Sequence, residues 1–214
     1  MSLPLRPVPI AGVVLAGGLG RRFGGVDKAF VDLDGRPLIG HVIDRFAPQV
    51  APLMISANGD PERFSAFGLP VVADPQPDRP GPLAGLAAAG LWLRAHRPEI
   101  DLVATVAVDL PALPLDLVER LASALTVHPQ ARVAVARSGE RLHPVVALHR
   151  LDGLDGLVAG LADGSVRRVV AWVEGRGAVT VDFEGADGGD PFVNVNTAAD
   201  LAAITKAGGV GKNP

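Results

Sequence analysis

A glycine-rich segment follows directly on an apolar run near the start of the chain. The run is Ile-Ala-Gly-Val-Val at residues 10–14, and residues 15–28 continue as Leu-Ala-Gly-Gly-Leu-Gly-Arg-Arg-Phe-Gly-Gly-Val-Asp-Lys. Five glycines lie between Gly17 and Gly25. Glycine adopts positive φ at no steric cost and lets backbone N–H groups approach an anion closely. The pattern therefore predicts a buried strand that ends in a phosphate-binding loop.

Basic side chains strengthen this interpretation. Arg21, Arg22 and Lys28 lie within or just after the glycines, where arginine forks and a lysine point charge can pair with phosphate oxygens. A plain surface turn is the alternative, and the adjacent arginines argue against it. The segment is not a P-loop, because Asp27 precedes the lysine and no hydroxyl residue follows it. It is not a dinucleotide fingerprint either, because Phe23 stands where the third glycine must pack.

Composition excludes several classes of protein. The chain has 214 residues, of which 48% are hydrophobic and 20% charged, as expected for one globular domain. The net charge of −3 provides no field for duplex nucleic acid. The absence of cysteine excludes thiolate metal sites and cysteine nucleophiles. No apolar run reaches the roughly 20 residues of a membrane span, so we expect a cytoplasmic protein without nucleic-acid or membrane partners.

Short apolar runs alternate with longer amphipathic ones along the chain. This alternation predicts an α/β fold with a doubly wound, mostly parallel (mixed) sheet flanked by helices. Residues 103–108 are apolar on both faces and should form a central strand. We expect a single domain over residues 1–206 and a disordered tail over 207–214. Strands are expected near 10–15, 52–57, 70–73, 102–108, 131–136, 144–149 and 178–182, and helices near 37–46, 83–95, 115–125, 151–162, 165–173 and 198–206.

Prolines and glycines refine this assignment. Pro37, Pro82 and Pro114 each stand where a helix is expected to begin. Thr197 is a typical N-cap for the last expected helix. Residues 137–196 are rich in glycine, and we expect an irregular rim over the sheet edge there.

Polar side chains follow three of the expected strands. Asp109 follows the central strand, and Asn58 and Asp74 follow two others. Ligands of open α/β sheets bind outside the carboxyl ends of the strands. A carboxylate is a suitable Mg²⁺ ligand and also accepts paired N–H or hydroxyl groups from a base or ribose. Each of these residue types is equally typical of a turn, so the residues by themselves leave both interpretations open.

Four further positions carry polar or permissive groups. Gly81 precedes the N-terminus of an expected helix, where a ribose or phosphate can approach closely. Asn194 and Asn196 are two apart in an extended run and should face the same side, although a turn before the last helix explains them equally well. His143 follows Arg141 closely, and a lone histidine is more often structural than functional.

The order of these motifs resembles that of the molybdenum cofactor guanylyltransferases, a family within the nucleotidyltransferase superfamily. The likeness spans about residues 10–204 and implies a Rossmann-like nucleotidyltransferase fold. The motifs that carry it are Leu15-Ala-Gly-Gly, Arg21-Arg-Phe-Gly-Gly, Asp27-Lys28, Ser56-Ala-Asn58, Ala73-Asp74, Gly81-Pro-Leu-Ala-Gly85, Asp109-Leu-Pro-Ala-Leu-Pro114, Arg141-Leu-His-Pro144 and Phe192-Val-Asn-Val-Asn-Thr197.

The resemblance also implies a role for each candidate residue. Arg22 and Lys28 would hold the triphosphate and act in catalysis together with Asp109, which would bind Mg²⁺. The nucleotide-binding set that the resemblance implies is Leu15, Ala16, Gly17, Gly18, Arg22, Lys28, Asn58, Asp74, Gly81 and Asp109, and the set near the acceptor substrate is His143, Asn194 and Asn196.

In this family GMP is transferred from GTP to the terminal phosphate of molybdenum-loaded molybdopterin, and pyrophosphate is released. The resemblance therefore implies GTP, molybdopterin and Mg²⁺ as ligands, and other molybdenum cofactor biosynthesis proteins and apo-molybdoenzymes as protein partners. The alternatives are a molybdopterin cytidylyltransferase, a sugar-1-phosphate nucleotidyltransferase and a non-catalytic GTP-binding regulator. Gly17-Gly18 favours guanine, because cytidylyl relatives tend to carry Ala-Gly there and the absent methyl leaves room for a purine. Asp109 argues against a regulator, which needs no catalytic metal ligand.

Overall fold

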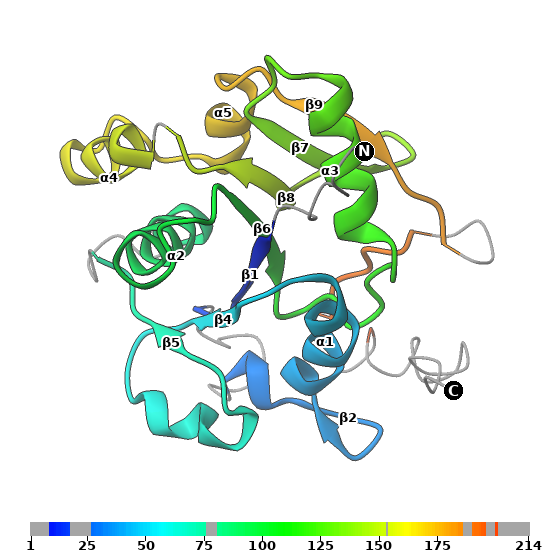
Figure 1. The fold of residues 1–214 in the computed structure, drawn as a ribbon. Helices are drawn as coiled ribbons and strands as arrows, with labels where there is room; N and C mark the ends of the chain where they lie inside the picture. Colours follow the sequence, from blue (N-terminus) through cyan, green and yellow to red (C-terminus); the bar gives the residue numbers. More distant parts are fainter. Residues whose placement is uncertain are drawn as a thin grey trace, which may run out of the picture.

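A seven-stranded sheet with helices on both faces forms the centre of the molecule (Figure 1). The structure is a computed structural model that describes residues 9–17, 27–75, 81–152, 154–185, 190–195 and 200. The strands of the sheet, in the order β5-β4-β1-β6-β8-β7-β9, are β5 (Val71–Val72), β4 (Leu53–Ser56), β1 (Ile10–Leu15), β6 (Leu102–Ala107), β8 (Arg141–Arg150), β7 (Val133–Ser138) and β9 (Val179–Asp182).

The strand directions confirm the expected mostly parallel, mixed sheet. β5, β4, β1 and β6 pair in parallel, as do β7 and β9, whereas β8 runs antiparallel to both β6 and β7. Since β1, β4 and β6 point the same way, their last residues Leu15, Ser56 and Ala107 lie together at one edge of the sheet. That edge is where the sequence places its candidate ligand-binding residues.

Helices cover the sheet on both sides. α1 and α3 lie on one face and α2 and α4 on the other (Figure 1). α2 begins at Pro82 and α1 directly after Pro37, as expected. The expected last helix and tail lie outside the described residues except for Asp200, which is helical. The helices are α1 (Leu38–Phe46), α2 (Pro82–His96), α3 (Leu117–Val127), α4 (Leu154–Asp163) and α5 (Val169–Glu174), with short 3-10 helices η2 (Lys28–Phe30), η3 (Ala47–Gln49) and η4 (Pro61–Phe67).

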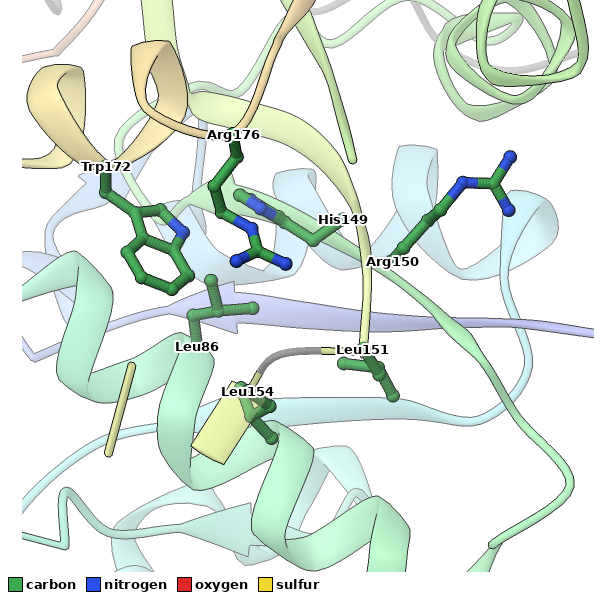
Figure 2. A pocket seen from close by; sticks show the side chains of 7 residues that line it. All are labelled: Leu86, His149, Arg150, Leu151, Leu154, Trp172 and Arg176. Carbon is green, nitrogen blue, oxygen red and sulfur yellow. The ribbon is translucent and has the colours of Figure 1, made fainter. Parts of the chain in front are cut away.

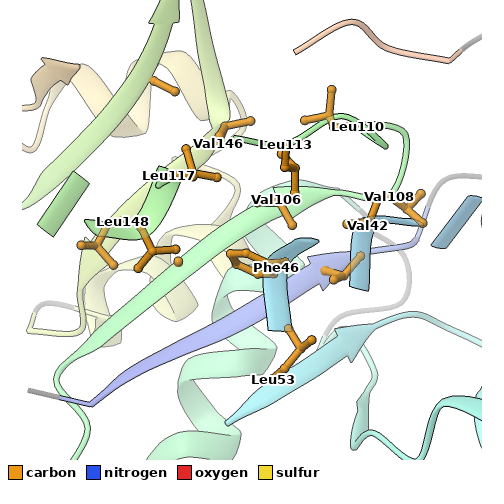
Figure 3. Packing of buried hydrophobic residues seen from close by; sticks show 14 of the residues in the cluster. Val42, Phe46, Leu53, Val106, Val108, Leu110, Leu113, Leu117, Val146 and Leu148 are labelled. Carbon is orange, nitrogen blue, oxygen red and sulfur yellow. The ribbon is translucent and has the colours of Figure 1, made fainter. Parts of the chain in front are cut away.

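The hydrophobic core is divided between the two faces of the sheet. Phe46 of α1, Leu117 of α3, Val106 of β6 and Leu148 of β8 belong to one buried cluster (Figure 3). Val103 of β6 belongs to the cluster under α2 and α4 on the opposite face. β6 is thus buried on both faces, which confirms the expected central strand and explains its continuous apolar sequence.

The strand expected near 144–149 is confirmed, but the expectation of an irregular rim over the sheet edge at residues 137–196 is wrong. β8 lies in this range and is hydrogen-bonded between β6 and β7 inside the sheet. Pro144 weakens the strand signal there, because proline cannot donate to a strand ladder. The sheet accommodates it where the β7–β8 register shifts between Val135 and Ala136, an irregularity of the kind that lets a strand carry proline.

Pro114 does not begin a helix, contrary to expectation. α3 begins three residues later at Leu117. The side-chain oxygen of Gln49 accepts a hydrogen bond from the N–H of Val118 in the first turn of α3 at 2.9 Å, and the Gln49 amide donates to the carbonyl of Pro114 at 2.9 Å. The proline therefore shapes the loop before α3, and a glutamine distant in sequence caps the helix.

A small hairpin was not expected from the sequence. β2 (Asp32–Leu33) and β3 (Arg36–Pro37) pair through a two-residue turn at Asp34 and Gly35, both with positive φ. Asp-Gly is a preferred dipeptide for such turns, so a usable signal was present in the sequence.

The helix α2 packs closely against the carboxyl ends of β1 and β4. A Cβ at Gly85 would lie 2.5 Å from Leu15 Cδ2 and 2.6 Å from Ser56 Oγ. Only glycine permits this approach without displacing its neighbours. The close packing places the N-terminus of α2, with Gly81, beside the edge that carries the candidate site.

We therefore expect Gly85→Ala to lower the free energy of unfolding by about 1–3 kcal/mol through overpacking. Gly156→Ala in α4 is the matched control, because an added Cβ there meets no atom within 4 Å. It should be neutral or stabilise the protein by up to about 1 kcal/mol, since alanine favours a helix more than glycine does. Urea unfolding measures both variants, and equal stabilities would contradict the close packing of α2.

Candidate active site

An ion pair joins two of the predicted site residues at the carboxyl edge of the sheet. Lys28 Nζ lies 2.6 Å from Asp109 Oδ2, and the two side chains are only 15% and 14% exposed. Asn194 Nδ2 donates to the same oxygen at 3.1 Å. One oxygen of this carboxylate is therefore bonded to a cation and to an amide.

The turn that carries Lys28 is fixed by local contacts. Asp27 is the N-cap of η2, and its Oδ1 accepts from the N–H of Ala29 at 3.1 Å. The ring of Phe30 stacks on the ring of Phe64 with centroids 5.2 Å apart. Lys28 thus lies in a short turn that Asp27 caps and that the stacked rings of Phe30 and Phe64 hold in place.

Asp109 is held by the strand that precedes it and by a segment from the end of the chain. The N–H of Val108 donates to the carbonyl of Leu15 at 3.1 Å, which continues the β1–β6 ladder to the neighbour of Asp109. The N–H of Val195 donates to the carbonyl of Asp109 at 3.0 Å. Residues 190–195, here named the strap, therefore bond both the backbone and the side chain of this aspartate.

The second oxygen of the Asp109 carboxylate, Oδ1, is buried and has no hydrogen-bond partner in the part of the chain that the structure describes. Buried polar atoms are normally paired, because an unpaired one loses its hydration without compensation. A divalent cation would supply the missing interaction. Among the described residues no group of three or more acidic or histidine side chains gathers. Mg²⁺ usually takes substrate phosphates and water as further ligands.

Asn58 and Asp74 form a second polar pair at the ends of β4 and β5. Asn58 Nδ2 donates to Asp74 Oδ2 at 2.9 Å, and the N–H of Asp74 donates to Asn58 Oδ1 at 2.9 Å. The N–H of Gly81 also bonds the carboxylate. Burial raises the pKa of Asp74, an effect opposed by the bonds from Asn58 and Gly81. The structure brings these three predicted residues together.

Arg63 links the two polar pairs, and sequence reasoning did not single it out. Its Nη1 lies 3.0 Å from Asp27 Oδ2, next to Lys28. Its Nη2 donates to the carbonyl of Asn58 at 2.8 Å. No motif marks this arginine, because its role depends on where η4 lies in the fold.

His143 lies inside a hydrogen-bonded group at the far end of the strap. Ser138 Oγ donates to Asp190 Oδ1 at 2.8 Å and lies 2.7 Å from His143 Nε2. Because the hydroxyl has one hydrogen, His143 must donate to it. Burial lowers the pKa of His143, an effect that Asp190 opposes and Arg141 reinforces. The ring also contacts Phe192 at a centroid distance of 4.7 Å.

The first residues of the glycine-rich segment lie where β1 ends. The N–H of Ala16 donates to the carbonyl of Ser56 at 2.8 Å, which extends the β1–β4 ladder beyond Leu15. A Cβ at Gly17 would meet no atom of the described residues within 4 Å. The remaining predicted site residues, Gly18, Arg22 and Asn196, lie outside the described residues, as does Arg21.

Comparison with known proteins agrees with this architecture. Residues 12–178 match the family described as the MobA-like NTP transferase domain. The chain belongs to this family. Members of the MobA-like family are nucleotidyltransferases, which typically use a divalent metal ion, and the unpaired Asp109 oxygen fits that requirement.

Individual relatives support this membership. The chain is 47% identical to a molybdenum cofactor guanylyltransferase of Mesorhizobium japonicum, over 92% of this chain and 95% of the relative. It is 44% identical to one of Bradyrhizobium sp., over 90% of each. A crystal structure from Archaeoglobus fulgidus, described as molybdopterin-guanine dinucleotide biosynthesis protein A, has the same fold. Its TM-score is 0.73 at 23% identity, and the match covers 92% of this chain and 97% of that one.

A hollow of this MobA-like chain lies away from the candidate site, near the start of β6. Its volume of about 210 Å³ includes the solvent at its mouth. His149 pairs with Val103 near the start of β6, so the hollow is remote from Asp109, which follows the end of that strand. The lining residues are Leu86, His149, Arg150, Leu151, Leu154, Trp172 and Arg176 (Figure 2).

Within the described residues, no helix is long and apolar enough to span a membrane.

The histidine in this hollow gives a pH-dependent prediction. Burial lowers the pKa of His149 from 6.5 to about 3, and Arg176 contributes in the same direction. Between pH 6.5 and about 3, His149 is protonated in the unfolded chain and neutral in the folded chain. We therefore expect the free energy of unfolding to fall as the pH drops from 6.5 toward 3, by at most about 1.4 kcal/mol per pH unit from this group.

Urea unfolding at several pH values measures this slope. His149→Leu should flatten it, whereas His96→Gln, at an exposed position of α2, should leave it unchanged. An unchanged slope in His149→Leu would contradict the prediction.

Proposed function

We propose that this chain transfers GMP from GTP to the terminal phosphate of molybdenum-loaded molybdopterin and releases pyrophosphate. The product is the guanine dinucleotide form of the molybdenum cofactor. Curated relatives with this activity in their names match nearly the whole chain. The observation that carries the proposal is the Lys28–Asp109 contact, in which the second carboxylate oxygen is buried and has no hydrogen-bond partner among the described residues.

We place the nucleotide across two halves of the site. The base and ribose lie toward Asn58 and Asp74, whose carboxylate suits paired N–H or hydroxyl donors. The triphosphate lies toward Lys28 and Arg22, which supply charge to the β- and γ-phosphates and to the departing pyrophosphate. The N-terminus of α2 at Gly81 supports this placement, because backbone N–H groups and the helix dipole favour an anion.

Asp109 is the proposed ligand for Mg²⁺. When bound, the ion would stabilise the negative charge that develops at the α-phosphate. The ammonium group of Lys28 is bonded to the same carboxylate, so the lysine lies next to the proposed metal site. Asn194 remains a proposed neighbour of the acceptor and also donates to Asp109. We assign it the further task of orienting the carboxylate so that Oδ1 remains available.

No general base is needed for this reaction. A phosphate oxygen of the acceptor is already ionised at neutral pH, so it can form a bond to the α-phosphorus of GTP without losing a proton. The bond from that phosphorus to the β-phosphate oxygen breaks, and pyrophosphate leaves with the electron pair. Catalysis then depends on alignment and charge stabilisation. His143 remains a proposed neighbour of the acceptor, as does Asn196.

The decisive experiment is incubation of the chain with molybdopterin, Mg²⁺ and radiolabelled GTP, followed by identification of the product. We expect the label in a molybdopterin guanine dinucleotide and an equal amount of pyrophosphate. GTP binding without pyrophosphate release would instead indicate a non-catalytic regulator. Transfer from CTP in preference to GTP would indicate a cytidylyltransferase. Other biosynthesis proteins and apo-molybdoenzymes are the proposed recipients of the product.

Removal of the proposed metal ligand should abolish most activity. We expect Asp109→Ala to lower kcat about 10²-fold or more, because the charge at the α-phosphate is no longer neutralised. Asp101→Ala is the matched control. Asp101 is exposed and directly precedes the first residue of β6, at the end of the strand opposite to Asp109. Steady-state kinetics at saturating Mg²⁺ measure both variants. A near-normal kcat in Asp109→Ala would exclude the residue as the metal ligand.

The choice between purine and pyrimidine should depend on Gly17. An added Cβ meets no atom of the described residues within 4 Å, so we expect Gly17→Ala to fold normally and to project its methyl group toward the nucleotide. We expect the ratio of kcat/KM for GTP over CTP to fall about tenfold, the order of magnitude for one methyl group in a pocket. Competition between the two nucleotides measures the ratio, and an unchanged ratio would remove Gly17 from the base pocket.

A further inference from the structure

We propose that Arg63 is a positioning residue that fixes the separation between the two halves of the nucleotide site. The inference rests on the proposed function, since it assumes a nucleoside triphosphate that spans both halves. Asp27 and Lys28 belong to the triphosphate half, and Asn58 and Asp74 to the base half. Arg63 bonds both halves at once.

The guanidinium fork of Arg63 makes this link with two different nitrogens. Nη1 lies 3.0 Å from Asp27 Oδ2, and Nη2 donates to the carbonyl of Asn58 at 2.8 Å. Asp27 is already committed through Oδ1 to the N–H of Ala29. Arg63 therefore bonds Asp27, which caps the turn that carries Lys28. Its other nitrogen bonds the backbone carbonyl of Asn58, whose side chain in turn bonds Asp74.

Arg63 is itself held in place by the aromatic pair beneath it. Its guanidinium lies 4.8 Å from the ring centroid of Phe64, which is 1% exposed and stacks on Phe30 of η2. At the start of η4, Asp60 Oδ1 accepts from the N–H of Glu62 at 3.0 Å. A capped helix and a stacked ring thus restrict the arginine to the orientation that reaches both acceptors.

The exposure of the pair indicates what this link contributes. The side chains of Arg63 and Asp27 are 34% and 24% exposed, and ion pairs this accessible add little to folding stability. Their effect falls instead on geometry. A ligand that reaches both halves gains from a fixed separation, because its second contact then forms at high effective concentration. A ligand confined to one half gains nothing.

This difference gives a test that separates positioning from direct contact. Affinities of wild-type chain and Arg63→Ala are measured by calorimetry with Mg²⁺ for three probes: GTP, pyrophosphate and GMP. We expect the Kd for GTP to rise about tenfold in the variant, and those for pyrophosphate and GMP to change by less than about twofold. Arg63→Lys should not restore GTP affinity, because an ammonium group lacks the fork that reaches two acceptors.

Arg36→Ala is the matched control, because it removes the exposed ion pair between Arg36 and Asp44, whose atoms lie 2.7 Å apart. It should leave all three affinities unchanged, and all variants should unfold cooperatively at the wild-type urea midpoint. An equal loss of GTP and pyrophosphate affinity would mean that Arg63 touches phosphate directly and would overturn the inference.

Unchanged GTP affinity in Arg63→Ala, or full recovery in Arg63→Lys, would overturn it as well. A wild-type chain that binds no GTP would overturn the proposed function itself and this inference with it, so the two failures are distinct.

Discussion

The contact between Lys28 and Asp109 is the constraint on which the rest of the site depends. Both charges are largely withdrawn from water, and such withdrawal is costly unless the charges are paired and hydrogen-bonded. Asp109 Oδ2 meets this condition through Lys28 and Asn194, whereas Oδ1 does not. The described residues therefore compensate only one of the two carboxylate oxygens. The interaction that completes it has to come from outside the described residues, and a divalent metal ion that accompanies a triphosphate would have the required positive charge.

The sheet explains how residues so distant in sequence meet at this point. β1, β4 and β6 run in parallel and end at one edge, so the residues that follow them are neighbours whatever lies between them in the chain. Gly85 lets α2 approach that edge, which brings Gly81 to the carboxylate of Asp74. The strap closes the other side by bonding Asp109.

Sequence reasoning succeeds where the fold leaves little choice. Apolar runs predict parallel strands, and parallel strands bring their carboxyl ends together, so the gathering of Asn58, Asp74 and Asp109 at one edge follows without knowledge of any side-chain contact. It fails where a contact depends on the arrangement of several elements. β8 enters the sheet antiparallel and carries Pro144 at an irregular register, and no local pattern signals either feature. Arg63 acts through the position of η4 against η2, which a list of motifs cannot contain.

The chemistry of the proposed reaction explains why positioning contacts are so prominent in this site. An acceptor phosphate is ionised before it reacts, so the protein need not move a proton. What remains for the protein is to align three charged groups and keep them aligned, and small displacements in such a site are costly in rate. Two sets of contacts serve this task. The strap bonds the Asp109 carboxylate and backbone, and Arg63 of η4 bonds Asp27, which caps the turn that carries Lys28.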